Sequence, residues 1–255
     1  MSTNNKESRF PTEVVDLPSK GLVYPEGHPL SSGKVEIKYM TAREEDILTS
    51  VNLIQDGTVI DELLKSVVIT KVDFNDIIIG DKNAIMLATR ILGYGKEYKA
   101  EVICKECGTK EDTDFDLTVY KYKDIDESVF KNENKFEYEL PNSKRKIEFK
   151  LLTQGDEANI IKEIQRQRDA GIKAVGEITT RLRYQLISVD GNSEPEAITN
   201  FINNEFFAVD SRSFREYYSN LSPDVDFKTH FGCAACKAVQ DVELPIQTNF
   251  FWPSR

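Results

Sequence analysis

The stretches "CKECG" at residues 104–108 and "CAACK" at residues 233–237 contain all four cysteines of this 255-residue sequence. Each stretch is a CxxC pair, and the two pairs lie far apart in the chain. A thiol–disulfide redox site needs only one such pair, and a disulfide-rich scaffold is shorter and contains more cysteine. The pattern therefore predicts one metal ion held by two distant hairpins.

Two CxxC pairs provide four thiolates, and zinc prefers soft sulfur ligands in a tetrahedral arrangement. Four cysteines would fill every position around the ion, so we expect one structural Zn²⁺ per chain. An ordinary zinc ribbon keeps its pairs within about twenty residues, and the separation here is much longer. An iron–sulfur cluster, a redox pair and free thiols stay open as alternatives. The expected ligands are Cys104, Cys107, Cys233 and Cys236.

The sequence is acidic, with 33 Lys and Arg residues against 43 Asp and Glu residues and a formal net charge of −10. This balance disfavours general binding to nucleic acid, which depends on neutralising phosphates. No apolar run is long enough to span a bilayer, and the polar start of the chain does not resemble a secretory signal. We therefore expect no membrane partner and a reducing, cytosolic environment, in which paired cysteines favour metal over a disulfide.

Local patterns predict a mixture of strands and helices. Apolar residues alternate over 34–39, which predicts a strand, and Thr41 with Glu44 forms a capping box that predicts a helix over 42–55. Asp81 is expected to be the N-cap of a helix, and Gly93 is expected to lie just past its end. Strand-like sequence flanks each CxxC pair. Further helices are expected over 58–69, 156–170, 177–189, 197–208 and 211–221.

The chain also resembles itself. "KVEIKYMTAREE" at 34–45 aligns with "KIEFKLLTQGDE" at 146–157, and an "LP" turn precedes each copy. Downstream, each copy passes through helices into a CxxC pair and then a strand. Amphipathic strand–helix junctions also resemble one another by chance, but four features agree in order. We predict an α+β fold that is internally duplicated, with two strand-plus-helices halves joined by a zinc-ribbon-like four-cysteine site.

The duplication predicts how the chain divides. The expected parts are an extended N-terminal arm at 1–16, a first α+β half at 17–122 with a zinc knuckle at 104–107, an acidic linker at 123–135, and a second α+β half at 136–255 with a zinc knuckle at 233–236 and an aromatic C-terminal tail. In the tail, Phe250, Phe251 and Trp252 are candidate partner-binding residues, because aromatic side chains dominate interface hot spots. The alternative is that these rings pack onto the chain's own core.

The sequence contains little that predicts an active site. There is no G-x-S-x-G, H-E-x-x-H or P-loop motif. Of the two histidines, His28 lies in a proline-rich loop and His230 lies close to Cys233. The glycine-rich stretch at 93–98 follows a helix, so it does not present amides at a helix start. We therefore predict no enzyme activity and no small-molecule substrate.

Several segments together carry a family resemblance: "LPSKGLVYP", "GKVEIKYMTAREEDIL", "DKNAIMLATRILGYGKEY", the "CKECG…FDL" block and the terminal "NFFWP". In this order they resemble the baseplate hub proteins and hub assembly factors of T4-like contractile-tailed bacteriophages. The resemblance covers most of residues 17–122 and the end of the chain, and it is weak over 158–225. The zinc prediction rests on the cysteines and not on the family.

The resemblance implies a non-enzymatic phage tail morphogenesis protein that is a structural or assembly component of the baseplate hub. Its implied partners are other phage baseplate or hub proteins. Its implied location is the tail baseplate of the virion, and the host cytoplasm during assembly. A different class of function also fits an acidic protein with a zinc ribbon: an adaptor that acts on transcription or on another host or phage protein complex.

Overall fold

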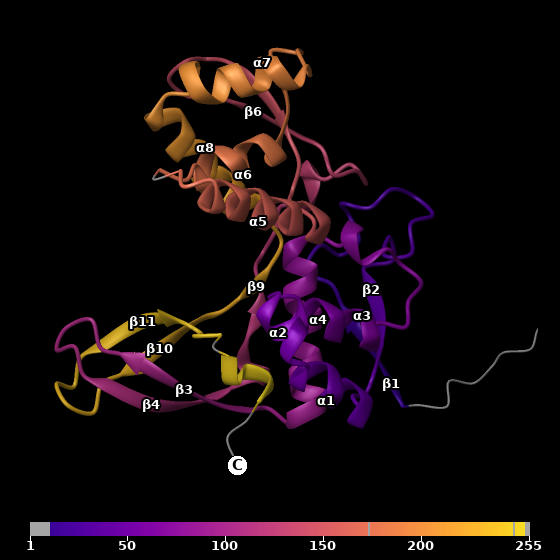
Figure 1. Ribbon diagram of the computed structural model, residues 1–255, viewed down its shortest axis with the longest axis vertical. Coiled ribbons are helices and arrows are strands. Elements are labelled where there is room, and N and C mark those ends of the chain that lie inside the picture. The colour runs from indigo at the N-terminus through magenta and orange to yellow at the C-terminus, as the bar shows by residue number, and fades with distance from the viewer. Residues whose placement is uncertain (1–10, 173, 247, 253–255) are drawn as a thin grey trace, which may run out of the picture.

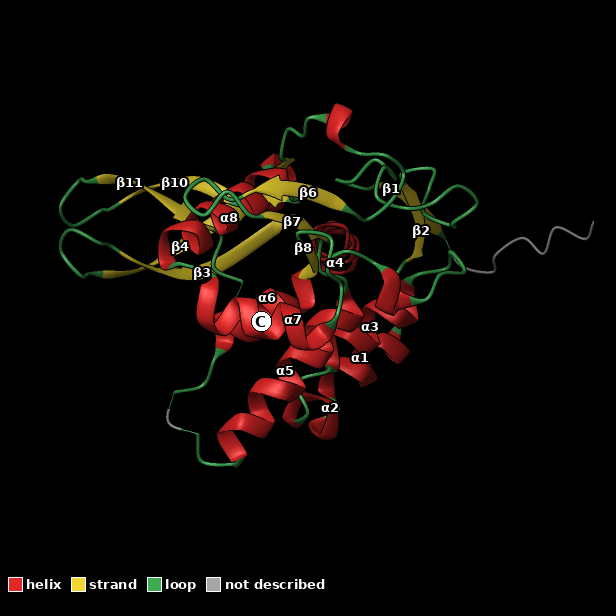
Figure 2. Ribbon diagram, turned by 90° about the horizontal axis from the view of Figure 1, so that it is seen from above, coloured by secondary structure: helices red, strands yellow, loops and turns green. Residues whose placement is uncertain are grey.

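The computed structural model describes residues 11–172, 174–246 and 248–252. Figure 1 shows a lobe built from the first part of the chain, a second lobe above it, and two long β-hairpins that project to one side. The two hairpins come from distant parts of the sequence and lie side by side in both views (Figures 1 and 2). The mixed helix and strand content predicted for the chain is confirmed.

The first lobe packs helices against a two-stranded antiparallel sheet. In β2, alternation places Val35 and Ile37 in the core, while α3 buries an apolar stripe that includes Leu63 and Leu64. The elements are β1 (Thr12–Asp16), β2 (Lys34–Lys38), α1 (Ala42–Thr49), α2 (Val51–Gln55), α3 (Val59–Val67), the short 3₁₀ helix η1 (Phe74–Asp76) and α4 (Ile79–Tyr94).

The second lobe packs helices against a three-stranded antiparallel sheet in the order β6-β7-β8. Aromatic rings form its core: Phe149 of β7 lies edge-on to Phe214 of α8, with ring centroids 5.1 Å apart. The elements are β6 (Phe136–Glu139), β7 (Lys146–Phe149), α5 (Gln154–Asp169), α6 (Glu177–Gln185), β8 (Leu186–Val189), α7 (Pro195–Asn200), the π-helix η4 (Phe201–Glu205) and α8 (Ala208–Leu221).

The hairpins alternate apolar residues on their facing sides with charged residues outside. Val102 of the first hairpin and Phe231 of the second are buried. The first hairpin is β3 (Glu97–Ile103) with β4 (Lys110–Asp116), and the second is β10 (Lys228–Gly232) with β11 (Val239–Glu243). A two-residue ladder, β5 (Lys121–Tyr122) with β9 (Val225–Asp226), joins their bases, and the remaining 3₁₀ helices are η2 (Leu117–Val119), η3 (Glu127–Val129) and η5 (Thr248–Phe251).

Several boundaries differ from the sequence-based expectations. Thr12–Asp16, expected in an N-terminal arm, is strand β1, because Val15 is buried and the segment pairs with β2; residues 1–10 lie outside the described residues. Leu186–Val189, expected to continue a helix, is strand β8, where tertiary pairing with β7 overrides the local pattern. Phe130, in the expected linker, packs its ring against Phe136 of β6, at 5.3 Å between centroids.

The second half also does not stay within one lobe. Its hairpin β10–β11 lies against the first hairpin, and η5 contacts α4 of the first lobe. The chain from α8 onward therefore returns to the first half and ties the two together.

Thr41 and Thr153 occupy matching places. Each follows a strand and precedes a helix, and each backbone amide donates to the carboxylate three residues on, Glu44 at 2.8 Å and Asp156 at 3.1 Å. The same carboxylates form ion pairs with lysines, Glu44 with Lys38 at the end of β2 at 2.7 Å and Asp156 with Lys150 just after β7 at 2.8 Å. These residues correspond one by one in the alignment of 34–45 with 146–157.

A second pair of matching contacts holds the "LP" turns. Asp81, the third residue of α4, accepts hydrogen bonds from the amide and hydroxyl of Ser19 at 2.9 and 2.7 Å. Asp210, the third residue of α8, accepts from the amides of Asn142 and Ser143 at 2.8 and 3.0 Å. Both aspartates are fully buried. Each lobe therefore fixes its turn with one buried carboxylate on a helix.

The two aspartates should differ in how they couple stability to pH. Burial raises the pKa of Asp81 to about 6, above the unfolded value of about 3.9. Its stability contribution is therefore fully present below about pH 4 and is lost as pH rises through about 6. Relative to Asp81→Asn, we expect the wild type to gain about 1 kcal/mol of unfolding free energy between pH 7 and pH 5, as measured by urea denaturation.

Asp210→Asn is the matched control. Burial alone would raise the pKa of Asp210, but the amides of Asn142 and Ser143 lower it on balance. A lowered pKa contributes stability that is lost only below the unfolded value, so this pair should show no gain between pH 7 and pH 5. Equal pH dependence in the two pairs would contradict the assignment.

Candidate metal centre

The two CxxC turns have the same backbone conformation. In each, the first cysteine's carbonyl accepts a hydrogen bond from the amide four residues on: Gly108 to Cys104 at 2.9 Å, and Lys237 to Cys233 at 3.0 Å. The donor residues have left-handed φ angles of 72° and 63°. Glycine adopts this conformation freely, as at Gly108, whereas Lys237 adopts it at some cost. The shared turn directs both sulfurs of each pair to the same side.

The turns bring together all four sulfur atoms, which lie within 4.8 Å of one another. The Sγ atoms of Cys104 and Cys236 are 3.7 Å apart, as are those of Cys107 and Cys233. A tetrahedron with zinc–sulfur bonds of about 2.3 Å has edges of about 3.8 Å, so these separations fit a shared ion. All four cysteines are free thiols, and no pair is a disulfide.

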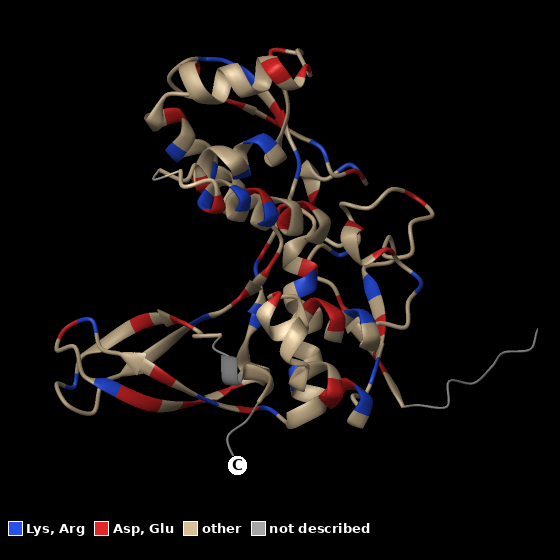
Figure 3. Cartoon of the chain, viewed as in Figure 1, with Lys and Arg blue, Asp and Glu red and all other residues tan. Residues whose placement is uncertain are grey.

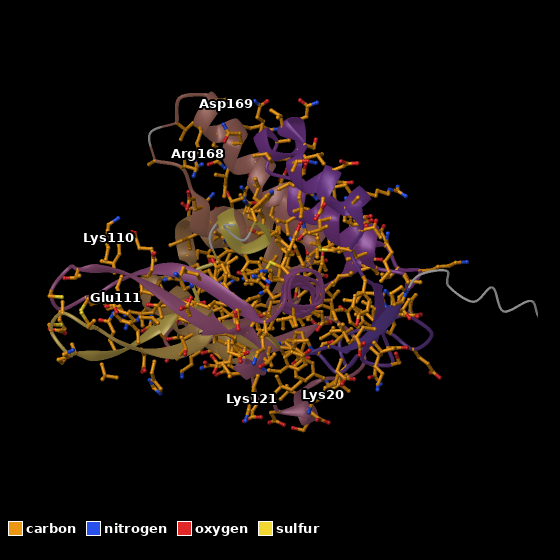
Figure 4. All side chains as sticks on the ribbon, turned by 90° about the horizontal axis from the view of Figure 1, so that it is seen from below. Lys20, Lys110, Glu111, Lys121, Arg168 and Asp169 are labelled. Atoms are coloured by element: carbon orange, nitrogen blue, oxygen red, sulfur yellow. The ribbon has the colours of Figure 1, made fainter. Side chains whose placement is uncertain are left out.

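The contacts around the cluster follow an approximate twofold symmetry. The amide of Lys105 donates to Gln240 Oε1 at 2.9 Å, and the amide of Ala234 donates to Glu111 Oε2 at 3.0 Å. Lys105 and Ala234 are as far apart in the sequence as Glu111 and Gln240. The two short sulfur pairs exchange under the same operation. Figure 4 shows Glu111 near the tip of the first hairpin.

Electrostatics favour a cation at this point. Hydrogen bonds with Thr109 lower the pKa of Cys107 to about 6. The Ala238 amide also lowers that of Cys236, but the neighbouring thiols, Cys107 first, raise the pKa of Cys236 to about 12. Four thiolates this close repel one another, so full deprotonation requires a positive ion among them.

Neither histidine belongs to the sulfur cluster. His230 lies on the outer side of β10, where its exposed Nδ1 is 2.6 Å from Asp241 Oδ1. His28 stacks on Tyr24, with ring centroids 4.7 Å apart, and its Nδ1 accepts the amide of Leu30. The cluster of possible metal ligands among the described residues therefore contains sulfur only.

At the base of the hairpins, Arg90 of α4 connects the chain segments that lead into and out of them. Its guanidinium is buried and donates to three carbonyl oxygens: Phe250 at 2.5 Å, Gly95 at 2.6 Å and Glu97 at 2.8 Å. Tyr98 of β3 donates its hydroxyl to the Pro245 carbonyl at 2.7 Å. The segments that enter and leave the hairpins are thus bonded to one another. Sequence patterns did not indicate Arg90, because its acceptors are backbone oxygens, which carry no residue-type signal, and one of them belongs to the distant Phe250.

The terminal aromatics divide into two kinds. Phe250 and Phe251 are each 1% exposed, and the Phe250 ring lies edge-on to Tyr98 with centroids 5.1 Å apart. Trp252 is partly buried against the same core. The two phenylalanine rings therefore pack onto the chain's own core, which is the alternative to partner binding given for the tail from the sequence. Only Trp252 keeps exposed surface for a partner.

Comparison with known proteins adds the family. A family model described as T4 bacteriophage base plate protein matches residues 12–252. The chain belongs to this family. The resemblance to T4-like baseplate proteins is thereby confirmed, and the match includes residues 158–225, where the quoted motifs gave little resemblance. No curated protein and no solved structure matches the chain.

Membership places the chain among the proteins of a phage tail base plate, a structural family whose members contact other base plate proteins. The matched range contains both lobes, both hairpins and all four cysteines. In this base plate protein, the four cysteines lie close enough together among the described residues to hold a metal ion.

Loss of the Phe250 ring should destabilise the base plate protein. Phe250→Ala removes a fully buried ring and leaves a cavity beside Tyr98, so we expect unfolding free energy to fall by about 3–5 kcal/mol. Trp252→Ala is the control and should cost clearly less, because its ring is only partly buried. Chemical denaturation of both variants measures the difference, and equal losses would contradict the packing described here.

Removal of a cysteine should abolish metal binding and affect the whole chain. The purified protein should contain about one zinc per molecule, and Cys104→Ser should lose it and melt at a lower temperature throughout. The control is His230→Asn, which changes an exposed neighbour outside the cluster and should keep its zinc. Elemental analysis and thermal denaturation provide the readouts. A zinc-free wild type that folds normally with zinc available would contradict this prediction.

Proposed function

We propose that this chain is a non-catalytic structural or assembly component of the phage baseplate hub, held together by one Zn²⁺. The family match over residues 12–252 supports the tail role. The four-sulfur cluster supports a structural ion, because four cysteine ligands leave no open coordination position for a reaction. Binding would add free energy to folding, on the order of 10 kcal/mol.

In this proposal Cys104 and Cys107 hold one side of the ion, and Cys233 and Cys236 hold the other. The ion would fix the tips of two hairpins that are otherwise joined at their bases by the hydrogen bonds of Arg90 and Tyr98. Such an arm keeps a defined shape away from the body of the molecule. A rigid projecting arm suits a component that contacts several neighbours in an assembly.

We further propose that the two halves arose by internal duplication. Its support is the repetition of contacts in the same order: the capping boxes of Thr41 and Thr153, the turns bonded to Asp81 and Asp210, and the paired CxxC turns. The second copy is longer between its capping box and its aspartate. Part of the difference is α5, which has 16 residues where α1 has 8.

The partners in this proposal are other baseplate or hub proteins, in the virion tail and, during assembly, in the host cytoplasm. None of the helices among the described residues combines the length and apolar character needed to cross a membrane. In the view of Figure 3, basic and acidic residues are interspersed along both hairpins and both lobes. A surface of mixed charge is better suited to binding other proteins than to binding a polyanion such as nucleic acid.

The test is mass spectrometry of purified phage particles and of baseplate intermediates from infected cells. We expect peptides of this chain in one or both. Phage that carry Cys104→Ser should yield fewer complete tails than phage that carry His230→Asn, because only the first change removes a proposed ligand. Absence from particles and intermediates, with capture on a transcription complex instead, would overturn the proposal in favour of the adaptor.

A further inference from the structure

The two lobes meet through a short antiparallel pairing. Ile78, just before α4, bridges Thr153, the residue that caps α5. The amide of Ile79 donates to the Leu152 carbonyl at 3.1 Å, and the amide of Gln154 donates to the Ile77 carbonyl at 2.8 Å. The first lobe thus contributes the segment just before α4, the helix that carries Asp81. The second lobe contributes its strand–threonine–helix junction at Thr153.

The second lobe has its own copy of the first of these segments. Phe207 precedes α8 as Ile78 precedes α4, and both have extended backbone with φ of −57° and −66°. Ile78 is 2% exposed, whereas Phe207 is 55% exposed. Among the described residues, neither the Phe206 carbonyl nor the Ala208 amide has a hydrogen-bond partner. We call residues 206–209 the free pairing segment.

The first lobe has its own copy of the strand–threonine–helix junction. Met40, Thr41 and Ala42 correspond to Leu152, Thr153 and Gln154 in the alignment of the two halves. Within the described part of the chain, the Met40 carbonyl and the Ala42 amide likewise have no hydrogen-bond partner, and Ala42 is exposed. We call residues 40–42 the free junction.

We propose that the free pairing segment of one chain binds the free junction of a second copy, so that chains associate head to tail. The internal contact uses one segment and one junction and leaves one of each unpaired. Figure 1 shows α8 and α1 towards opposite ends of the long axis, which suits pairing between chains. Association of unlike surfaces either closes into a ring or continues as a chain of subunits.

The proposal rests on the internal duplication and extends it to contacts between chains. The exposed side chains support it, because Phe207 is 55% and Val209 63% exposed and both are apolar. Such side chains gain free energy when a partner covers them. The backbone groups of the free junction are the acceptor and donor that the free pairing segment lacks.

The contact between chains cannot be as close as the internal one. A Cβ on Gly155 would lie 3.0 Å from Asn75, and the corresponding residue of α1 is Arg43. The larger Arg43 side chain keeps the two surfaces further apart, so the association is weaker than the internal contact and reversible.

One substitution removes a single hydrogen-bond donor from the free junction. Ala42 is the first residue of α1, where proline is well tolerated, and Thr41 before it is extended, with φ of −123° and ψ of 177°. Ala42→Pro therefore removes the amide that would donate to Phe206 and leaves the helix intact. Phe207→Asp with Val209→Asp blocks the other surface. Ile161→Asp, on α5 and 58% exposed, is the matched control.

Sedimentation velocity of the full, zinc-loaded chain tests the proposal from low to high micromolar concentration. The wild type and Ile161→Asp should associate as concentration rises, and each blocking variant should stay monomeric. An equimolar mixture of Ala42→Pro with the Phe207→Asp, Val209→Asp variant should form dimers and nothing larger, because one intact surface of each kind remains. Only a head-to-tail contact produces this result.

A wild type that is monomeric throughout, or blocking variants that associate like the wild type, would overturn the proposal. Binding of the free pairing segment to a different tail protein while this chain stays monomeric would overturn it as well. Zinc content and thermal melting are measured on every variant. These readouts separate loss of self-association from failure of the zinc centre or of the fold, on which the proposed function depends.

Discussion

Four sulfur atoms within 4.8 Å of one another impose the constraint on which the rest of the chain depends. As thiolates they repel one another. As neutral thiols they form only weak hydrogen bonds, which stabilise the contact between the hairpins very little. A shared cation turns the same spacing into four attractive bonds. β3 buries Tyr98, Ala100 and Val102, but β4 and β10 bury one side chain each and β11 buries none, so apolar packing alone gives the hairpins limited stability. The arm therefore needs connections at both of its ends.

The two connections differ in chemistry and complement each other. At the tip, the cysteines come from the turns, so any ion there fixes turn to turn. At the base, Arg90 donates to carbonyl oxygens that belong to both the first hairpin and the C-terminal segment. A buried guanidinium is costly unless its donors are satisfied, and here backbone oxygens and the ring of Tyr98 surround it. Phe250 and Phe251 lie in the core at the base of the hairpins, where their rings provide apolar packing.

Sequence patterns predicted what is local. The capping boxes of Thr41 and Thr153 span four residues each, and the CxxC turns span five, so their geometry is set by neighbouring residues. Asp81 shows the limit: it was expected to cap its own helix, but its carboxylate bonds to Ser19, far away in the sequence. Likewise, the apolar run Leu186–Val189 fits helix or strand equally, and pairing with β7 decides between them. The four-cysteine cluster could be predicted from residue type, whereas the hydrogen bonds of Arg90 to backbone carbonyls could not.

Two kinds of pseudosymmetry coexist in the chain, and they have different consequences. The hairpins are related by an approximate twofold operation, in which both sides of the contact use the same surface. Such a contact is complete within one molecule. The lobes are related differently: the segment before α4 meets the junction before α5, which are unlike surfaces. A twofold contact between duplicated halves leaves nothing over, but a contact between unlike surfaces always leaves one unused surface of each kind. In this chain the unused pair is apolar on one side and has unsatisfied backbone groups on both. In the isolated chain, the exposure of Phe207 and Val209 costs free energy, because their apolar side chains contact water. In the proposed duplication, the contact between the halves is therefore complete at the hairpins and leaves one surface of each kind unused at the lobes, where the proposed head-to-tail association would lower the free energy.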